Sequence, residues 1–170
     1  TNISYNTRDI DLNYSVIDLN FDSVWYTNDT GISNYTLTSN LSLANWNENS
    51  NTIILYANDS AGNENSTNVT FISDTVYSLL YIDSPANISY NTKSIDLNYN
   101  IIDTNLDSVW YTNDSGVSNY TLTSNLSLAL WNENTNTITM CSNDSANNEN
   151  CTATTFLSDS IYPNIIIDDI

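Results

Sequence analysis

The chain has 170 residues, of which 20 are Asp or Glu, two are Lys or Arg and none is His, so its formal net charge is −18. Two cations cannot neutralise a phosphate backbone or hold an anionic lipid surface, which argues against nucleic acids and anionic membranes as partners. Apolar residues make up 40% of the chain, too many for a disordered protein, and no apolar run of about 18 residues is present to insert into a membrane.

The first predicted element is a half-buried strand at Ile10–Val16, where every second residue is apolar. Asn-rich clusters separate the predicted strands at intervals of roughly 8–12 residues, a spacing typical of a β-sandwich. The chain has only 3 Gly, so we expect Asn to occupy left-handed turn positions, as where Asn147 replaces Gly62 of the first half. Further strands are predicted, in chain order, at Ser23–Thr27, Ser33–Thr38, Asn40–Trp46, Thr52–Asn58 and Thr67–Ser73.

The second half of the chain repeats the first half without a gap, at a period of 85 residues and with 57 identities in the 85 pairs. Even the two cations, Arg8 and Lys93, occupy the same repeat position. We therefore expect an all-β chain made of two copies of one β-sandwich module. The chain has no initiator Met and no signal-peptide pattern, so we also expect a mature or excised piece.

Four tryptophans divide into two kinds by their place in the predicted strands. Trp25 and Trp110 lie in the middle of a strand, so we expect core aromatic residues there. Trp46 and Trp131 end a strand, so they are the better candidates for a ligand platform, although packing is the favoured role for them as well.

The chain resembles a known kind of repeat in its opening and closing motifs. The motif SPANISYNT stands at Ser84–Thr92, and NDSANNENC stands at Asn143–Cys151. They resemble the tandem immunoglobulin-like repeats of large archaeal surface proteins, a style also found in some bacterial surface proteins. The resemblance covers both copies and implies two tandem immunoglobulin-like β-sandwich domains in an extracellular or cell-surface location. Such modules mostly serve as structural units or spacers in surface layers, stalks, adhesins and filaments, and they bring no catalytic motif.

N-glycosylation sequons are numerous and fall on predicted outward or turn positions, so we expect N-linked glycans if the chain is secreted. The alternative is that they are ordinary polar surface residues of an Asn-rich protein. The 14 sequon asparagines are Asn2, Asn13, Asn28, Asn34, Asn40, Asn58, Asn65, Asn68, Asn87, Asn113, Asn119, Asn125, Asn143 and Asn150.

The two cysteines, Cys141 and Cys151, occur only in the second copy, where they flank a predicted hairpin turn. Strand parity places both on the outer face, so we predict a cross-strand disulfide bond, which fits an oxidising compartment. A metal site is the weaker alternative, because two cysteines without histidine make an incomplete ligand set.

Carboxylates and nucleophiles are weak candidates for chemistry. Asp59 with Glu64, and Asp144 with Glu149, flank turns rich in oxygen atoms, so calcium is conceivable, but the spacing of a calcium loop is missing. Ser and Thr have no histidine partner, and the same carboxylates occur in both copies. We therefore predict no enzyme activity and no required cofactor.

The junction between the copies predicts an unusual assembly. The apolar segment Ser78–Asp83 is predicted to be the first strand of the second domain. Residues 1–74 contain no such strand, because they begin at the equivalent of Ala86. We expect domains at 1–74 and 75–163, followed by residues 164–170 as a strand that adds to the first domain of the next unit. A frayed tail is the alternative. The assembly strand is Asn164, Ile165, Ile166, Ile167, Asp168, Asp169 and Ile170.

Two functions fit these observations. The first is a structural repeating unit of an extracellular glycosylated filament, stalk or surface layer, whose partners are copies of itself. The second is an adhesin-type module that recognises carbohydrate or a partner cell surface. A binding protein usually specialises one copy, whereas these copies have identical loop lengths, which favours the structural role. The unit is either a separate subunit or a stretch of a longer repeat polypeptide.

Overall fold

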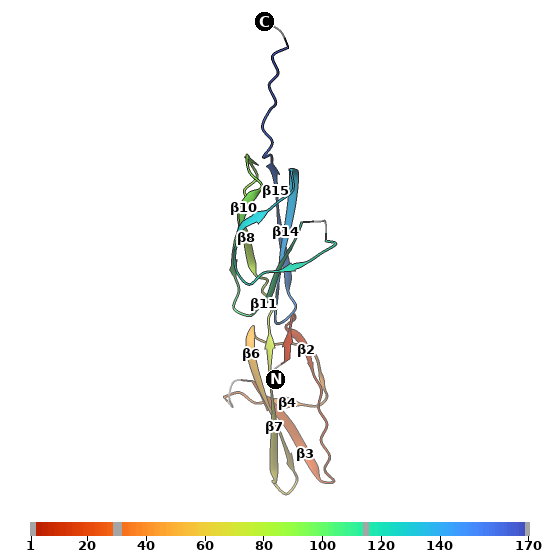
Figure 1. Cartoon of the computed structure of the whole chain (residues 1–170). Helices are drawn as coiled ribbons and strands as arrows, with labels where there is room; N and C mark the ends of the chain where they lie inside the picture. Colours follow the sequence, from red (N-terminus) through yellow and green to blue (C-terminus); the bar gives the residue numbers. More distant parts are fainter. Residues whose placement is uncertain (1–2, 29–31, 114–115, 169–170) are drawn as a thin grey trace. The chain divides into compact units, whose positions relative to one another are not determined.

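The computed structural model describes residues 3–28, 32–113 and 116–168 of the chain (Figure 1). All the elements in these residues are β-strands, which confirms the predicted all-β class, and no helix among them is long and apolar enough to cross a bilayer. The chain divides into two compact units, Thr1–Val76 and Tyr77–Ile170. We call them domain one and domain two and describe each by itself.

Domain two is a sandwich of two sheets with an immunoglobulin-like strand order. One sheet has three antiparallel strands, in the order β8 (Leu79–Ser84), β10 (Ser94–Ile102) and β13 (Leu126–Leu130). The other sheet has five strands, in the order β12 (Tyr120–Thr121), β11 (Leu106–Thr112), β14 (Asn134–Asp144), β15 (Glu149–Ser158) and β9 (Ser89–Tyr90). The strand β9 runs parallel to β15, and the other pairs are antiparallel.

Domain one repeats this architecture with one strand fewer among its described residues. Its larger sheet has the order β1 (Ile3–Tyr5), β7 (Glu64–Ser73), β6 (Asn49–Asp59), β3 (Phe21–Thr27) and β4 (Tyr35–Leu37). Its smaller sheet pairs β2 (Asp9–Leu12) with β5 (Leu41–Asn45). Over the residues that the structure describes, no strand of this sheet corresponds to β8 of domain two.

In each sandwich the tryptophan that ends a predicted strand packs in the core, as the favoured prediction has it, whereas the mid-strand tryptophan does not. Trp46 and Trp131 are each only 3% exposed, and both belong to the core clusters. The Trp46 indole N–H donates to the carbonyl of Ile10 at 2.9 Å, so its one polar group is paired. Trp25 and Trp110, predicted in the core, are half-buried on the opposite face of their strands. The valine before each of them points inward, and neighbouring side chains of a strand point to opposite faces.

Asparagine supplies left-handed backbone positions, as predicted. Gly62 has a φ of +83°, and Asn147, which replaces it in domain two, has a φ of +68°. Asn134, the first residue of β14, has a φ of +75°. The buried side chain of Asn136 secures this turn: its amide donates to the carbonyls of Asn132 at 2.8 Å and Asn134 at 3.1 Å, and its oxygen accepts from the Asn132 amide at 3.1 Å. Domain one has the same arrangement at its own turn.

Candidate assembly site

The strand β8 completes the core of domain two. It runs antiparallel to β10, with Leu80 opposite Ile101 and Ile82 opposite Tyr99. Leu80 is only 6% exposed, and Ile82 packs against the same core cluster. The strand also lies against β14 and β15 of the facing sheet. A strand in this position therefore pairs with the backbone hydrogen-bonding groups at the edge of one sheet, and it covers apolar side chains of the other sheet.

Polar contacts fix the start of β8. The hydroxyl groups of Ser78 and Ser142 are hydrogen-bonded to each other, and both residues are buried. The Asn150 side-chain amide donates to the Ser78 carbonyl at 2.8 Å. These contacts tie the residue before the strand to the facing sheet, so they help to set where the strand begins.

The same edge is open in domain one. The described residues include no strand beside residues 13–17, which we call the open edge. The sequence predicts a strand over Ile10–Val16, but β2 ends at Leu12, whereas β10 continues to Ile102. The predicted length is thus wrong for domain one. The physical reason is that a strand needs backbone hydrogen bonds to a neighbour, and β8 provides them only in domain two.

The facing sheet of domain one is uncovered at the same place. Three side chains on the inner face of β7 are exposed, namely Asn65, Thr67 and Val69. Their equivalents on β15 are half-buried, namely Asn150, Thr152 and Thr154. The difference lies on the strand that β8 contacts in domain two. Domain one therefore exposes the surface that a strand equivalent to β8 would cover.

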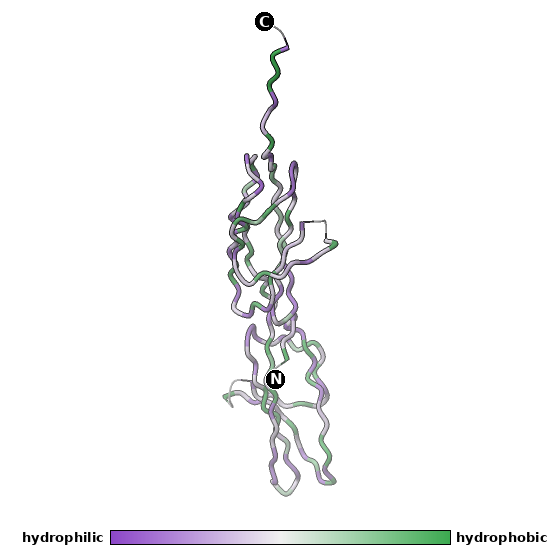
Figure 2. Tube along the Cα trace, viewed as in Figure 1, coloured by the Kyte–Doolittle hydropathy of each residue, from purple (hydrophilic) through white to green (hydrophobic). Residues whose placement is uncertain are grey.

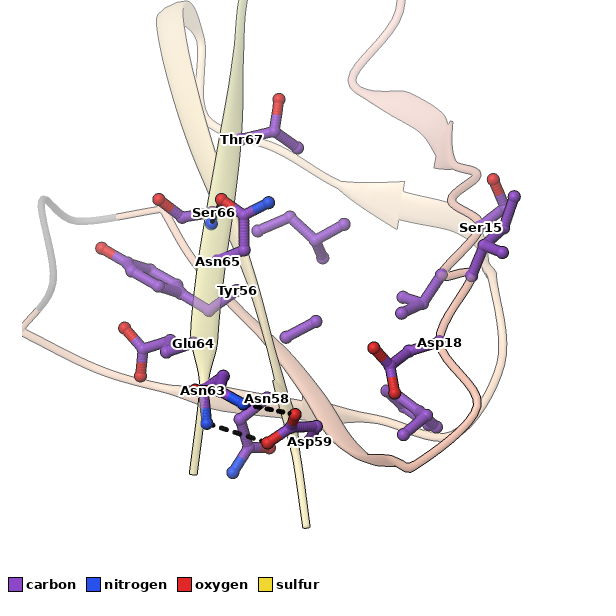
Figure 3. Close-up of a pocket in the computed structure, with 15 residues that line it drawn as sticks. Ser15, Asp18, Tyr56, Asn58, Asp59, Asn63, Glu64, Asn65, Ser66 and Thr67 are labelled. Carbon is purple, nitrogen blue, oxygen red and sulfur yellow. Dashed lines mark hydrogen bonds between the residues drawn. The ribbon is translucent and has the colours of Figure 1, made fainter. Parts of the chain in front are cut away.

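A cavity of about 350 Å³ opens between the open edge and the β6–β7 hairpin. Figure 3 shows Ser15 and Asp18 on one side of it and Asn63 and Glu64 of the hairpin on the other. Its apolar lining comes from Val16, Ile17, Phe21, Leu55 and Ala57. A second hollow, of about 670 Å³, shares Val16 and Phe21 with it. The lining thus combines these apolar side chains with polar ones such as Asp59 and Asn65.

The segment Asn164–Ile170, which we call the C-terminal segment, is the repeat equivalent of Leu79–Pro85. Its described residues form no strand and are exposed, with Ile165 at 84% and Ile167 at 77%. Figure 1 shows the described part of the segment running away from the sheets of domain two, and Figure 2 shows a hydrophobic stretch within it. Asp169 and Ile170 lie outside the described residues.

The residues before the C-terminal segment repeat the junction before β8. In domain one, the Glu48 carboxylate accepts hydrogen bonds from the hydroxyl of Thr75 and, at 3.1 Å, from its amide. In domain two, Glu133 accepts from the hydroxyl of Ser160 and, at 3.0 Å, from its amide. These two bonds lower the pKa of Glu133. The chain thus leaves both domains through the same contacts.

The acidic residues considered for calcium hold their own turns. The Asp144 carboxylate accepts from the amides of Ala146 at 2.8 Å and Asn148 at 2.9 Å, and from the Asn148 side chain at 2.7 Å. Asp59 makes the equivalent bonds, and those from Asn63 lower its pKa. These bonds give both aspartates a structural role in their turns, and the absence of a required cofactor stays a prediction.

The sequon asparagines differ in access. Nine are exposed: Asn13, Asn34, Asn40, Asn65, Asn68, Asn87, Asn113, Asn119 and Asn125. Four are half-buried: Asn28, Asn58, Asn143 and Asn150. Asn2 lies outside the described residues. Asn150 differs from the other three because its amide nitrogen, the atom that a glycan would occupy, already donates to the Ser78 carbonyl.

The predicted disulfide bond is present. Cys141 and Cys151 are directly opposite each other on β14 and β15, and their sulfur atoms are bonded at 2.05 Å. In domain one, Tyr56 occupies the position of Cys141, and its ring stacks on Trp25 with the centroids 5.6 Å apart. A covalent bond in one domain thus takes the place of aromatic stacking in the other. Disulfide bonds of this kind are typical of extracellular domains.

Comparisons with known proteins find distant likenesses only. No family model and no curated protein matches the chain. Among solved structures, the fibronectin(III)-like modules of Clostridium thermocellum CbhA are 12% identical, with 99% of this chain and 94% of that chain covered and a TM-score of 0.47. The N-terminal four Ig domains of Dscam1 isoform 1.9 are 7% identical, with 94% and 42% covered and a TM-score of 0.44. The three N-terminal domains of the bacteriophage RB49 Hoc capsid protein are 12% identical, with 80% and 48% covered and a TM-score of 0.41.

Proposed function

We propose that this chain is a structural repeating unit of an extracellular glycosylated filament, stalk or surface layer. The C-terminal segment of one unit adds as a strand to the open edge of domain one in the next unit. One observation carries the proposal: the edge that β8 fills in domain two is open in domain one, and the C-terminal segment is the repeat equivalent of β8.

The repeat transfers the β8 register to the proposed contact. Leu80 faces Ile101 in domain two, so Ile165 would face Val16 in an antiparallel pair. Ile167 would face Tyr14 in the same way. Both isoleucines would then point into the cavity, as Leu80 points into its own core. Their burial would provide the hydrophobic part of the association free energy.

The contacts at the two domain exits favour a following domain as the recipient. Glu133 holds Ser160 as Glu48 holds Thr75, and the Thr75 junction leads directly into β8 of the domain that follows. A second domain one would follow domain two in the same manner. Donor and acceptor are different surfaces, so the contact is head-to-tail, and it extends into a filament where the rotation between units does not close a ring. This holds whether the unit is a separate chain or a stretch of a longer polypeptide.

Two features support an extracellular location for this filament. The disulfide bond is typical of an oxidising compartment. Eight exposed sequon asparagines, all of the nine except Asn65 on the face that the added strand would cover, offer attachment points for N-linked glycans. Glycans on the outer faces would also limit unwanted pairing of exposed sheet edges, a task that charged residues perform in other β-proteins.

The test compares two chemically identical substitutions in the full chain. Ile165→Asn changes a side chain that would face the cavity, whereas Ile166→Asn changes one that would face solvent, as Tyr81 does in β8. We expect light scattering to show concentration-dependent assembly of the unaltered chain. We expect Ile165→Asn to weaken this association by roughly 30- to 100-fold, which corresponds to the loss of one buried isoleucine, and Ile166→Asn to change it little. A chain that stays monomeric at all concentrations, or equal effects of the two substitutions, would overturn the proposal.

A further inference from the structure

We infer that the residue before the added strand and the residue that it faces form a matched pair, which directs each strand to its own domain. This inference rests on the proposed function. In domain two the pair is Ser78 with Ser142, whose hydroxyl groups bond to each other. The repeat equivalents are Pro163 and Ala57. The polar pair within one unit is thus replaced, on both sides at once, by an apolar pair between successive units.

Mismatched combinations leave a buried hydroxyl without its partner. Ser78 is 1% exposed and Ser142 is 0% exposed, so water does not replace a lost contact at this position. If the C-terminal segment occupied domain two, Pro163 would face Ser142, which would keep only a long contact of 3.5 Å to the Asn150 carbonyl. If a strand like β8 occupied domain one, its serine would face Ala57. Burying an unpaired hydroxyl is unfavourable, so both mismatches bind more weakly than the matched pairs.

The remaining contacts at this position are compatible with both pairs. The Asn150 amide donates to the backbone carbonyl of Ser78, and Pro163 retains that carbonyl. Asn65 is the equivalent of Asn150 and is exposed on the uncovered face of β7. Proline lacks an amide hydrogen, but Pro163 precedes the strand, where a ladder bond is not required. Its ring also restricts the backbone before the segment, which reduces the entropy lost on binding.

This arrangement would give the filament a single direction of assembly. The C-terminal segment matches domain one, and β8 matches domain two, so neither strand gains by displacing the other. Selection against the wrong partner by an unpaired polar group is a common way to obtain specificity. The sequence analysis did not single out these four residues. The available signal was that positions 57 and 163 both depart from serine in a repeat where most residues are identical.

The test is a double-mutant cycle in the full chain. Ala57→Ser and Pro163→Ser each create a mismatch, and each should lower the association constant by roughly 5- to 100-fold. The double substitution rebuilds the serine pair between chains and should recover most of that loss. Pro163→Ala is the matched control, because it removes the ring without adding a hydroxyl. Circular dichroism and thermal unfolding of the dilute chains check that each variant is folded.

The outcomes separate this inference from the proposed function. Suppose that the unaltered chain assembles and that Ile165→Asn weakens this assembly. If the effects of Ala57→Ser and Pro163→Ser on the association constant then multiply in the double variant, the matched pair is refuted while strand addition stands. If the unaltered chain does not assemble, the proposed function itself fails. A second measurement is independent of assembly. The substitution Ser142→Ala should destabilise domain two more than the Ser78→Ala/Ser142→Ala double variant does. An equal or larger loss of stability in the double variant would also overturn the inference.

Discussion

Moving the C-terminal segment to the other end of the chain should close domain one within a single molecule. In the natural chain, β8 leads through Pro85 directly into Ala86, the equivalent of Thr1. A variant in which residues 161–170 are removed from the C-terminus and joined directly before Thr1 reproduces that connection. The added strand then reaches the open edge without a second chain, so we expect a monomer at all concentrations.

The structure sets the size of the expected stabilisation. Ile165 and Ile167 are 84% and 77% exposed, whereas Leu80, the equivalent of Ile165, is 6% exposed. Full burial of one such side chain contributes about 1.5–3 kcal/mol, so the two contribute roughly 3–6 kcal/mol before the ordering of the strand is subtracted. A net gain of about 2 kcal/mol would raise the Tm of a domain of this size by roughly 8–16 °C.

Calorimetry and amide hydrogen exchange measure the two halves of this prediction. The transition of domain one should move to higher temperature, and the amides of residues 13–17 should become protected. The control is the same rearranged chain with Ile165→Asn and Ile167→Asn, which should lose both effects. If residues 13–17 exchange as fast in the rearranged chain as in the dilute natural chain, with an unchanged transition, the assignment of the open edge is refuted.

Three further predictions concern stability and modification. Reducing the Cys141–Cys151 bond should lower the unfolding free energy of domain two by about 2–3 kcal/mol and leave domain one unchanged. Calorimetry under reducing conditions measures both transitions, and equal shifts of the two transition temperatures would contradict this prediction. Asn136→Ala removes three hydrogen bonds from a buried turn and should cost about 2–4 kcal/mol in urea denaturation; a change near zero would contradict the role given to this side chain. Glycopeptide mass spectrometry of native material should find Asn34 occupied and Asn150 bare, because the Asn150 amide is bonded to Ser78, and equal occupancy would refute that reasoning.

Much of the fold follows from local sequence patterns that the repeat shows twice. Alternating apolar residues and Asn-rich turns predict short strands, and the substitution of Gly62 by Asn147 predicts a left-handed position that the backbone adopts. The disulfide bond was predictable because Cys141 and Cys151 appear together in one copy, on either side of a hairpin turn. In each case the determining interactions are close in sequence, so that one chain segment contains the necessary information.

Trp25 and Trp110 were misplaced because the local pattern is ambiguous around them. Val24, Trp25 and Tyr26 are three successive large side chains, so alternation alone does not say which of the two faces is inward. The valine is buried, and the tryptophan stacks on Tyr56 on the outer face. Trp46 follows the last residue of its strand, yet its indole turns into the core because the Ile10 carbonyl is available to pair with it. That partner is distant in sequence and visible only in the fold.

The candidate site was predicted from the sequence, and the structure adds a disagreement between the strand pattern and the strand that forms. Tyr14 and Val16 continue the alternation that begins at Ile10, and in domain two the same alternation is a regular strand that ends at Ile102. In domain one the strand stops at Leu12, although the sequence beyond it still suits a strand. Periodicity describes which face a residue prefers, but the strand itself forms only where a neighbour accepts its hydrogen bonds. Among the described residues of domain one, the sequence beyond Leu12 keeps the strand pattern without a neighbour, and the proposed function assigns that place to the C-terminal segment with its exposed isoleucines.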